Sequence, residues 1–318
     1  IISDMLNDFI PTATVDKARN GQEALELIEY NEYDIILMDL FMPIMDGFEL
    51  MNILCNDQKY KELPIIITTG NNGIEDEKKA LELGAWDFVS KPYDVDIIKF
   101  RIKNAIDRSQ LFAMKKLKFL AEYDVLTEIY NKEKFSEMTR KMLDLYHDEK
   151  FAFLRFDIDR FQLVNSFFGM DEGDRLLKYI GKGLQIKLSS QKHCTYGRIE
   201  SDVFCICVTY DKIHMNELLN SLKDLLANFN ADYDIVPSIG VYIVEDNSIP
   251  IDVLYKRSAL AAKKCKNDYI NFCSFYDEKM ERDLKIEQEV TNGMNIALIE
   301  HQFVMYYQPK YDIFTNKP

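Results

Sequence analysis

Asp34-Ile-Ile-Leu-Met-Asp-Leu-Phe-Met-Pro-Ile-Met-Asp-Gly47 is the segment on which the fold expected for the first third of the chain depends most. It opens with a short apolar run that ends at Asp39, and a second run, Pro64-Ile-Ile-Ile-Thr-Thr69, follows it. Stretches with helical periodicity, such as residues 21–30, alternate with these runs. Because short apolar strands that alternate with helices are typical of a parallel sheet covered by helices, we predict an α/β domain here.

Three chemically complementary residues lie where the predicted strands end. Asp39 closes one strand, Thr69 closes the next, and Lys91 follows the strand at residues 86–90. Functional groups gather at such strand ends in α/β sheets. A carboxylate that accepts a phosphoryl group needs a cation to balance charge, a hydroxyl to hold an oxygen, and Mg²⁺. Each residue alone also fits a strand-end cap or a solvated charge, but the three together predict a phosphoryl-accepting site.

This region resembles the receiver domains of two-component response regulators. The resemblance rests on four motifs, Asn20-Gly-Gln-Glu-Ala-Leu25, Met38-Asp-Leu-Phe-Met-Pro-Ile-Met-Asp-Gly47, Thr68-Thr-Gly70 and Ser90-Lys-Pro92. It implies a flavodoxin-like, five-stranded parallel sheet, and the first strand is expected to lie before Ile1. In the family that strand carries the acidic pair that anchors Mg²⁺, so phosphorylation is expected of the intact protein. The resemblance also implies a cis bond between Lys91 and Pro92.

The resemblance assigns a role to each residue of the predicted acceptor site. Asp39 would take up the phosphoryl group, and it would hold Mg²⁺ together with the backbone carbonyl of Phe41. Thr69 and Lys91 would contact the phosphoryl group, and Phe88 would be the switch aromatic. A sensor histidine kinase is the implied partner.

Residues 94–122 contain neither Gly nor Pro and predict one long helix. Its apolar residues recur at three- and four-residue steps, at Ile102, Ile106, Ala113, Leu117 and Leu120. Such a seam fits packing on the helix's own domain, and it fits a dimerising coiled coil equally well. We place a receiver domain that lacks its first strand at residues 1–106 and a helical linker at residues 107–122.

Residues 123–280 mix helical and strand-like runs, which predicts an α+β domain. Asp157-Ile-Asp159 stands at the end of one strand-like run, and Glu200-Ser-Asp-Val-Phe204 precedes another. Two carboxylates at the ends of neighbouring strands can hold a divalent metal over a triphosphate. An Asp-x-Asp by itself more often caps a turn or is solvated.

This α+β segment resembles the GGDEF, or diguanylate cyclase, family. The resemblance rests on Asp124-Val-Leu-Thr-Glu-Ile-Tyr-Asn131, on residues 157–174, on Ser238-Ile-Gly-Val241 and on Phe275-Tyr-Asp-Glu-Lys-Met280. It implies a ferredoxin-like cyclase palm, two copies of which join two GTP molecules into cyclic-di-GMP. It also implies that Asp157, the Ile158 backbone carbonyl and Asp202 bind metal. Asn165 and Asp174 would contact guanine, and Lys266 would contact phosphate.

The departures from the GGDEF pattern predict an eroded site. Glu200 and Ser201 stand where the family has two glycines. A residue other than glycine held at positive φ costs about 1 to 2 kcal/mol. Glu200 also repels phosphate, Val203 removes the second signature carboxylate, and the family's product-inhibition motif is absent at Gln191-Lys-His-Cys194. We therefore expect no cyclase turnover, with GTP as a possible ligand of the eroded domain.

Residues 281–318 resemble the entry to EAL domains, barrels that hydrolyse cyclic-di-GMP. A polar-faced helix leads there into the strand-like run Gln302-Phe-Val-Met-Tyr-Tyr-Gln-Pro-Lys-Tyr-Asp312. The catalytic signature of that family would fall after Pro318. We therefore expect the start of an EAL domain to follow a degenerate GGDEF domain at residues 123–280.

Composition limits the classes of partner and the cellular compartment that we expect for this protein. With 53 acidic and 39 basic side chains the net charge is −14, which disfavours a nonspecific grip on nucleic acid or anionic membranes. Six cysteines without a CxxC pair fit a reduced, cytoplasmic protein.

The function predicted from these features is that of a bacterial phosphorelay response regulator in cyclic-di-GMP signalling. Phosphorylation of Asp39 would gate a downstream EAL phosphodiesterase, in a homodimer, through the impaired GGDEF domain. Two alternatives stay open at this point. One is an active diguanylate cyclase that makes cyclic-di-GMP from GTP, and the other is a noncatalytic signalling scaffold.

Overall fold

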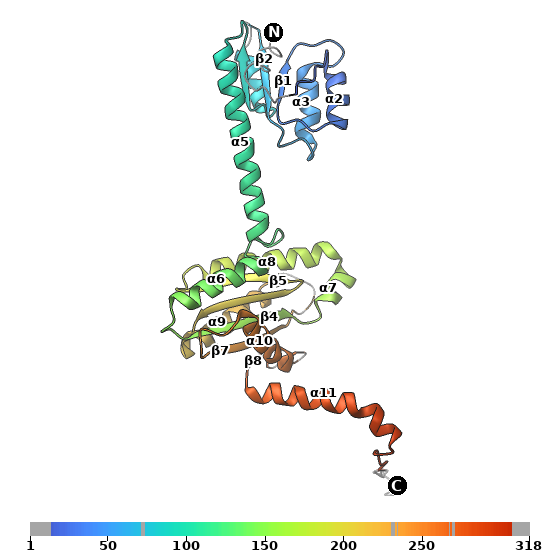
Figure 1. The fold of residues 1–318 in the computed structure, drawn as a ribbon, viewed down its shortest axis with the longest axis vertical. Helices are drawn as coiled ribbons and strands as arrows, with labels where there is room; N and C mark the ends of the chain where they lie inside the picture. The colour runs from blue at the N-terminus through green and yellow to red at the C-terminus, as the bar shows by residue number, and fades with distance from the viewer. Residues whose placement is uncertain are drawn as a thin grey trace. The chain divides into compact units, whose positions relative to one another are not determined.

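The computed structural model describes residues 14–70, 74–229, 233, 235–266, 268 and 271–306, with Thr69 and Ile74 described by their backbone alone. The chain divides into two compact units, residues 1–119 and residues 120–318. Figure 1 shows that each unit has its own sheet with helices around it.

The first unit is built on a parallel sheet with the strand order β1 (Ile36–Asp39), β2 (Ile65–Thr69) and β3 (Asp87–Ser90). Along β2 the buried side chains alternate between two apolar clusters. Ile65 and Ile67 pack with residues of α2 (Gly21–Tyr30), α3 (Gly47–Asn56) and α4 (Ile74–Glu82), whereas Ile66 packs with residues of α5 (Val95–Glu122). Helices therefore cover both faces of the sheet, as predicted for an α/β domain.

The number of strands differs from the expectation. A five-stranded sheet without its first strand would leave four strands, but the described residues hold three, and residues 14–18 have no regular structure. In the flavodoxin-like order 2-1-3-4-5 the second strand pairs only with the first. Since no described strand takes the place of the first, residues 14–18 have no ladder to join. The predicted cis bond between Lys91 and Pro92 is confirmed.

The second unit is built on a five-stranded sheet in the order β5-β6-β4-β7-β8. The strands are β4 (Phe151–Ile158), β5 (Cys194–Glu200), β6 (Val203–Thr209), β7 (Pro237–Val244) and β8 (Cys273–Phe275). The central strand β4 runs antiparallel to both of its neighbours, and β8 pairs with β7 in parallel. Interleaved helices and a mixed sheet confirm the α+β prediction.

Helices cover both faces of this second sheet, and β4 divides its side chains between them. Ala152, Leu154 and Phe156 face α8 (Met170–Leu188) and α9 (Lys212–Ala227). Phe151 and Phe153 face α6 (Lys132–Leu145) and α10 (Ile251–Cys265). A short helix, α7 (Phe161–Phe168), follows β4 directly. Because successive side chains of a strand point to opposite faces, the position of a residue in β4 determines which face of the sheet it lies on.

The predicted long helix is confirmed as α5, a single helix over Val95–Glu122. Its apolar seam behaves differently along its length. Ile102 is buried against the sheet of the first unit, whereas Leu117 and Leu120 are 67% and 48% exposed. The first half of the seam therefore packs on its own unit, and the second half has an exposed apolar face.

The helix expected near residue 281 is confirmed as α11 (Glu278–Ile299), which buries none of its residues. The strand-like run after it is not a strand over residues 303–306, and residues 307–318 lie outside the described residues. The start of an EAL barrel thus remains a prediction. No helix in the described part of the chain is long and apolar enough to cross a membrane.

Candidate functional sites

The predicted acceptor carboxylate, Asp39, is the last residue of β1 and lies beside the lysine that was predicted to assist it. The Nζ atom of Lys91 forms an ion pair with Oδ2 of Asp39 across 52 residues of sequence. The backbone N–H of Phe41 donates to Oδ1 of Asp39 at 3.3 Å. The hydrogen bond to Asp39 raises the pKa of Lys91 above its usual value. Parallel strands thus bring the two predicted residues together at one edge of the sheet.

The loop after Asp39 is held against the end of β1 by a short-range turn. The side chain of Asp46 caps α3 by accepting from the N–H of Glu49 at 2.8 Å, and the N–H of Gly47 donates to the carbonyl of Leu40 at 2.9 Å. A Cβ atom at Gly47 would lie 2.6 Å from the carbonyl oxygen of Asp39. Only glycine permits this approach, so the Asp-Gly pair of the motif sets the path of the loop beside the carboxylate.

The other predicted residues of this site are placed less completely. Thr69 ends β2, next to the strand of Asp39, but its side chain lies outside the described residues. Phe88 packs against the apolar cluster of α3 and α4, and the guanidinium carbon of Arg101 lies 5.2 Å from the centre of its ring. The two residues predicted to hold Mg²⁺, Asp39 and Phe41, lie at the end of β1 and two residues after it. Among the described residues no group of three acidic, histidine or cysteine side chains could complete a ligand set for this ion.

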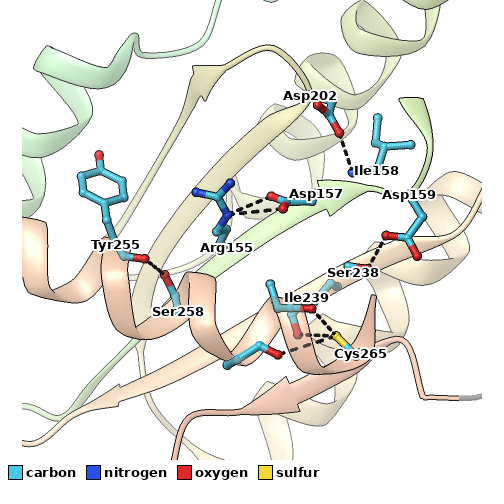
Figure 2. Close-up of polar contacts among 12 residues, drawn as sticks. Arg155, Asp157, Ile158, Asp159, Asp202, Ser238, Ile239, Tyr255, Ser258 and Cys265 are labelled. Carbon is cyan, nitrogen blue, oxygen red and sulfur yellow. Dashed lines mark hydrogen bonds and ion pairs between the residues drawn. The ribbon is translucent and has the colours of Figure 1, made fainter. Parts of the chain in front are cut away.

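In the second unit, two predicted metal ligands come together from separate strands. Asp157 is near the end of β4, and Asp202 lies in the turn between β5 and β6. The backbone N–H of Ile158 donates to Oδ2 of Asp202 at 3.2 Å, which holds the turn against the end of β4 (Figure 2). Ser238 donates to the carboxylate of Asp159 next to them (Figure 2).

Sequence reasoning missed Arg155, which forms an ion pair with Asp157. The Nε atom of Arg155 lies 3.0 Å from Oδ1 of Asp157, and the two side chains are only 19% and 13% exposed. That Oδ1 atom is buried and accepts no hydrogen bond among the described residues. Burial raises the pKa of Asp157, and Asp202 adds to this effect, whereas Arg155 and Lys266 act against it. The signal was in the sequence, because residues two apart on a strand share a face.

The β5–β6 turn shows how the glycine replacements are accommodated. Glu200 pairs with Val203 across the turn, and Ser201 adopts a φ of +43°. Glu200 is exposed and is not among the residues at positive φ, whereas Val203 is 5% exposed in the cluster of α6 and α10. The expected strain therefore falls on one of the two positions.

A third carboxylate–cation pair includes an arginine that donates a hydrogen bond to this turn. Nη1 of Arg198 lies 3.0 Å from Oδ1 of Asp124, and Nε of Arg198 donates to the carbonyl of Ser201 at 2.8 Å. Burial acts to raise the pKa of Asp124, but hydrogen bonds from Thr127 and Arg198 outweigh it and hold the pKa below its usual value. A cleft of about 260 Å³ lies here, lined by Asp124, Asn131, Lys132, Glu133, Arg198, Ile199, Glu200 and Ser201. It does not include the predicted metal ligands.

The predicted guanine contacts lie on the two helices that follow β4. Asn165 is on α7 and Asp174 is on α8, and both are partly exposed. A Cβ atom at Gly173 would lie 1.9 Å from Oδ1 of Asn165, so the amide of Asn165 lies against α8 at Gly173, the residue before Asp174. Lys266 caps the C-terminus of α10, is exposed, and acts electrostatically on Asp157.

Comparison with known proteins identifies both units. Residues 1–103 match the family model of the response regulator receiver domain, and residues 121–271 match that of the diguanylate cyclase, GGDEF domain. A probable cyclic di-GMP phosphodiesterase of Vibrio cholerae is 36% identical over 88 residues, covering 28% of this chain and 20% of that protein. The heme response regulator HssR of Staphylococcus haemolyticus is 37% identical over 98 residues, covering 31% of this chain and 42% of that protein.

The chain also resembles a solved structure. The coiled coil and GGDEF domain of DgcB from Caulobacter crescentus, in complex with c-di-GMP, aligns with a TM-score of 0.47 at 15% identity. The alignment covers 57% of this chain and all of that chain.

Proposed function

We propose that this chain, which combines a receiver domain with a GGDEF domain, acts as a phosphorelay response regulator in cyclic-di-GMP signalling and takes up phosphate at Asp39. The observation that carries the proposal is the ion pair between Lys91 and Asp39 at the end of β1. In the proposed step a carboxylate oxygen of Asp39 attacks the phosphorus of a phosphohistidine. The P–N bond breaks and its electron pair stays on the imidazole nitrogen of the sensor kinase.

The chain's own residues would supply the charge balance for this step. The ammonium group of Lys91 would move from the carboxylate to a phosphoryl oxygen, and the N–H of Phe41 already orients Oδ1 of Asp39. Mg²⁺, when bound, would balance the remaining charge of the phosphoryl group, with Asp39 and the Phe41 carbonyl among its ligands. Thr69 is proposed to hold a phosphoryl oxygen, and Phe88 to respond to phosphorylation.

The test is to incubate the intact protein with a small phosphodonor and Mg²⁺ and to measure the mass of the intact chain. We expect one added phosphoryl group, which Asp39→Asn abolishes because it removes the nucleophilic oxygen. Asp34→Asn is the matched control, since Asp34 is an exposed carboxylate shortly before the same strand. Labelling of Asp39→Asn at the parent level would refute the proposal.

We further propose that the GGDEF domain does not make cyclic-di-GMP. The support is that Ser201 and Glu200 replace the glycines of the phosphate cradle, and that a buried valine, Val203, replaces a signature carboxylate. Chromatography of a mixture of the protein, GTP and Mg²⁺ is expected to show no cyclic-di-GMP. Metal-dependent formation of that product would establish the alternative, an active cyclase.

The same domain is proposed to bind guanine nucleotides weakly through Asn165 and Asp174. The contact of Asn165 with Gly173, the residue before Asp174, supports the proposal, because a base-reading site needs both residues in one region. In calorimetric titrations we expect GTP and GDP to bind more tightly than ATP. The preference should disappear in Asp174→Ala. Absence of heat with GTP at millimolar concentration would contradict the proposal.

The output is proposed to be an EAL phosphodiesterase whose first residues overlap 281–318, gated by the phosphorylation of Asp39 in a homodimer. The exposed second half of the α5 seam supports dimerisation, because Leu117 and Leu120 present an apolar face at helical spacing. Light scattering of the intact protein with and without phosphodonor, together with cyclic-di-GMP hydrolysis in the same samples, tests this part. Hydrolysis that is unaffected by the phosphodonor would contradict the proposed gating by the receiver.

A further inference from the structure

The expected metal ligands of the GGDEF domain already have partners within the protein. Asp157 pairs with Arg155, and Asp202 accepts a hydrogen bond from the N–H of Ile158 (Figure 2). Among the described residues, no group of three acidic, histidine or cysteine side chains could hold a metal ion. Because Arg155 and the Ile158 N–H already engage Asp157 and Asp202, these residues do not fit a resident divalent cation at this place.

Arg155 is held where a cation would have to bind. It is the third residue before the end of β4's paired segment at Ile158, and its register partners are Cys205 on β6 and Gly240 on β7. These small neighbours leave room for a long side chain on the face that also carries Asp157. A buried guanidinium needs a charged partner, and Asp157 is the one that the structure provides. A divalent ion on Asp157 would lie next to this fixed positive charge.

The remaining donors of Arg155 are available. A guanidinium has five N–H donors, and within the described part of the chain only Nε is joined to a partner, the carboxylate of Asp157 (Figure 2). Planar N–H pairs of this kind bind phosphate oxygens in a bidentate manner. Lys266, whose charge also acts on Asp157, adds a second cation to the same neighbourhood.

We propose that Arg155 takes the place of the divalent cation, so that the GGDEF domain binds the phosphates of a guanine nucleotide without Mg²⁺. The nucleotide part of this inference rests on the guanine binding proposed above, whereas the exclusion of metal from Asp157 does not. The two parts are therefore tested by separate measurements.

The first measurement is Mn²⁺ binding, followed by electron paramagnetic resonance, in the full chain with Asp39→Asn to remove the receiver ligand. We expect no Mn²⁺ to be held by Asp157 in this parent. Arg155→Met should gain one site, and adding Asp157→Asn should remove it again. The matched control is Arg282→Met, an exposed arginine on α11, which should gain no site.

Two outcomes of this measurement would overturn the exclusion of metal. One is a Mn²⁺ site in the Asp39→Asn parent that Asp157→Asn abolishes, and this comparison does not require that any Arg155 variant folds. The other is a folded Arg155→Met chain, judged by circular dichroism, that gains no site. Neither outcome depends on nucleotide, so the proposed guanine binding would be unaffected.

The second measurement compares GTP titrations in Mg²⁺ and in EDTA. The affinity of the parent is expected to differ by less than about threefold between the two, and Arg155→Met should weaken binding in EDTA by about tenfold or more, the size of one lost charge-assisted contact. Arg155→Lys should recover part of that loss, because it retains a cation. Binding of GTP that requires Mg²⁺ would overturn the proposal, whereas absence of GTP binding in every condition would refute the proposed function while the Mn²⁺ result stands.

Discussion

The receiver and the GGDEF domain each pair one carboxylate at a strand end with one cation, but the two pairs are built in opposite ways. Lys91 reaches Asp39 from the position directly after β3, and the two side chains are 38% and 32% exposed. Arg155 lies two residues before Asp157 on the same strand, and both side chains are mostly buried. A flexible, solvated ammonium can leave a carboxylate when a phosphoryl group arrives, whereas a buried guanidinium without another anion cannot. Exposure of the pair therefore separates a cation that can leave its carboxylate from one that stays on it.

The largest expected effect comes from breaking the buried pair. Arg155→Ala leaves the Asp157 carboxylate without its counter-charge, and we expect it to lower the free energy of unfolding of the GGDEF domain by about 3 kcal/mol. The raised pKa of Asp157 lets it take up a proton as the pH falls, so the loss should shrink on acidification. Urea denaturation at several pH values measures it.

A double variant is the control for this comparison. Arg155→Met combined with Asp157→Leu removes both charges and fills their volume, so most of the stability should return, to within about 1 kcal/mol of the parent. A single Arg155→Ala variant as stable as the parent would show that the pair is solvated and that the contrast between the two sites is wrong.

The third pair, Asp124 with Arg198, gives the next effect. Asp124→Asn should cost about 2 kcal/mol at neutral pH, because the hydrogen bonds to the charged carboxylate are weakened. The folded-state pKa of Asp124 is lowered, so its contribution is present above the unfolded value and is lost as the pH falls through the folded one. The difference between variant and parent should therefore vanish in acid.

Asp144→Asn is the matched control for Asp124. Asp144 also pairs with an arginine, Arg140, but its side chain is 64% exposed, and such pairs contribute little. Denaturation of the two variants at pH 7 and at low pH separates them. An equal, small effect of both would show that Arg198 does not support the β5–β6 turn.

Replacing Glu200 or Ser201 by glycine, the residue that the GGDEF motif has at both positions, should change the stability of the domain with opposite sign. Ser201→Gly relieves a positive φ and should stabilise the GGDEF domain by about 1 kcal/mol, after the greater freedom of glycine in the unfolded chain is allowed for. Glu200→Gly has no such strain to relieve and should destabilise the end of β5 by about 0.5 kcal/mol. Thermal denaturation of the pair tests this. The same sign for both would mean that the turn changes its conformation in the variants.

The smallest stability effect is expected at the exposed pair. Lys91→Ala should change the stability of the receiver domain by less than about 1 kcal/mol, because a solvated ion pair contributes little. Any response of the protein to phosphodonor should nevertheless be lost, since no ammonium is left to meet the phosphoryl group. A large loss of stability would mean that this pair resembles Arg155 and Asp157 more closely than its exposure indicates.

Features that depend on local pattern could be predicted from the sequence. The long helix of α5 followed from the absence of Gly and Pro and from its periodicity. The meeting of Asp39 with Lys91 followed from the rule that parallel strands end at one edge of a sheet. The need for positive φ in the β5–β6 turn followed from the replaced glycines, although which of the two would bear it did not.

The partners of the polar residues near the C-terminal end of β4 depend on tertiary packing. The pattern of β4 places Arg155 and Asp157 on one face, but their pairing depends on burial by elements distant in sequence and on the small residues of β6 and β7 beside them. Burial of the α5 seam also depends on tertiary packing, since packing against the receiver sheet ends partway along a continuous apolar stripe. Burial, and with it the strength of a charge pair, is a property of the packed chain. A sequence pattern can therefore place two charges together, but it does not determine whether the pair stays exposed to water.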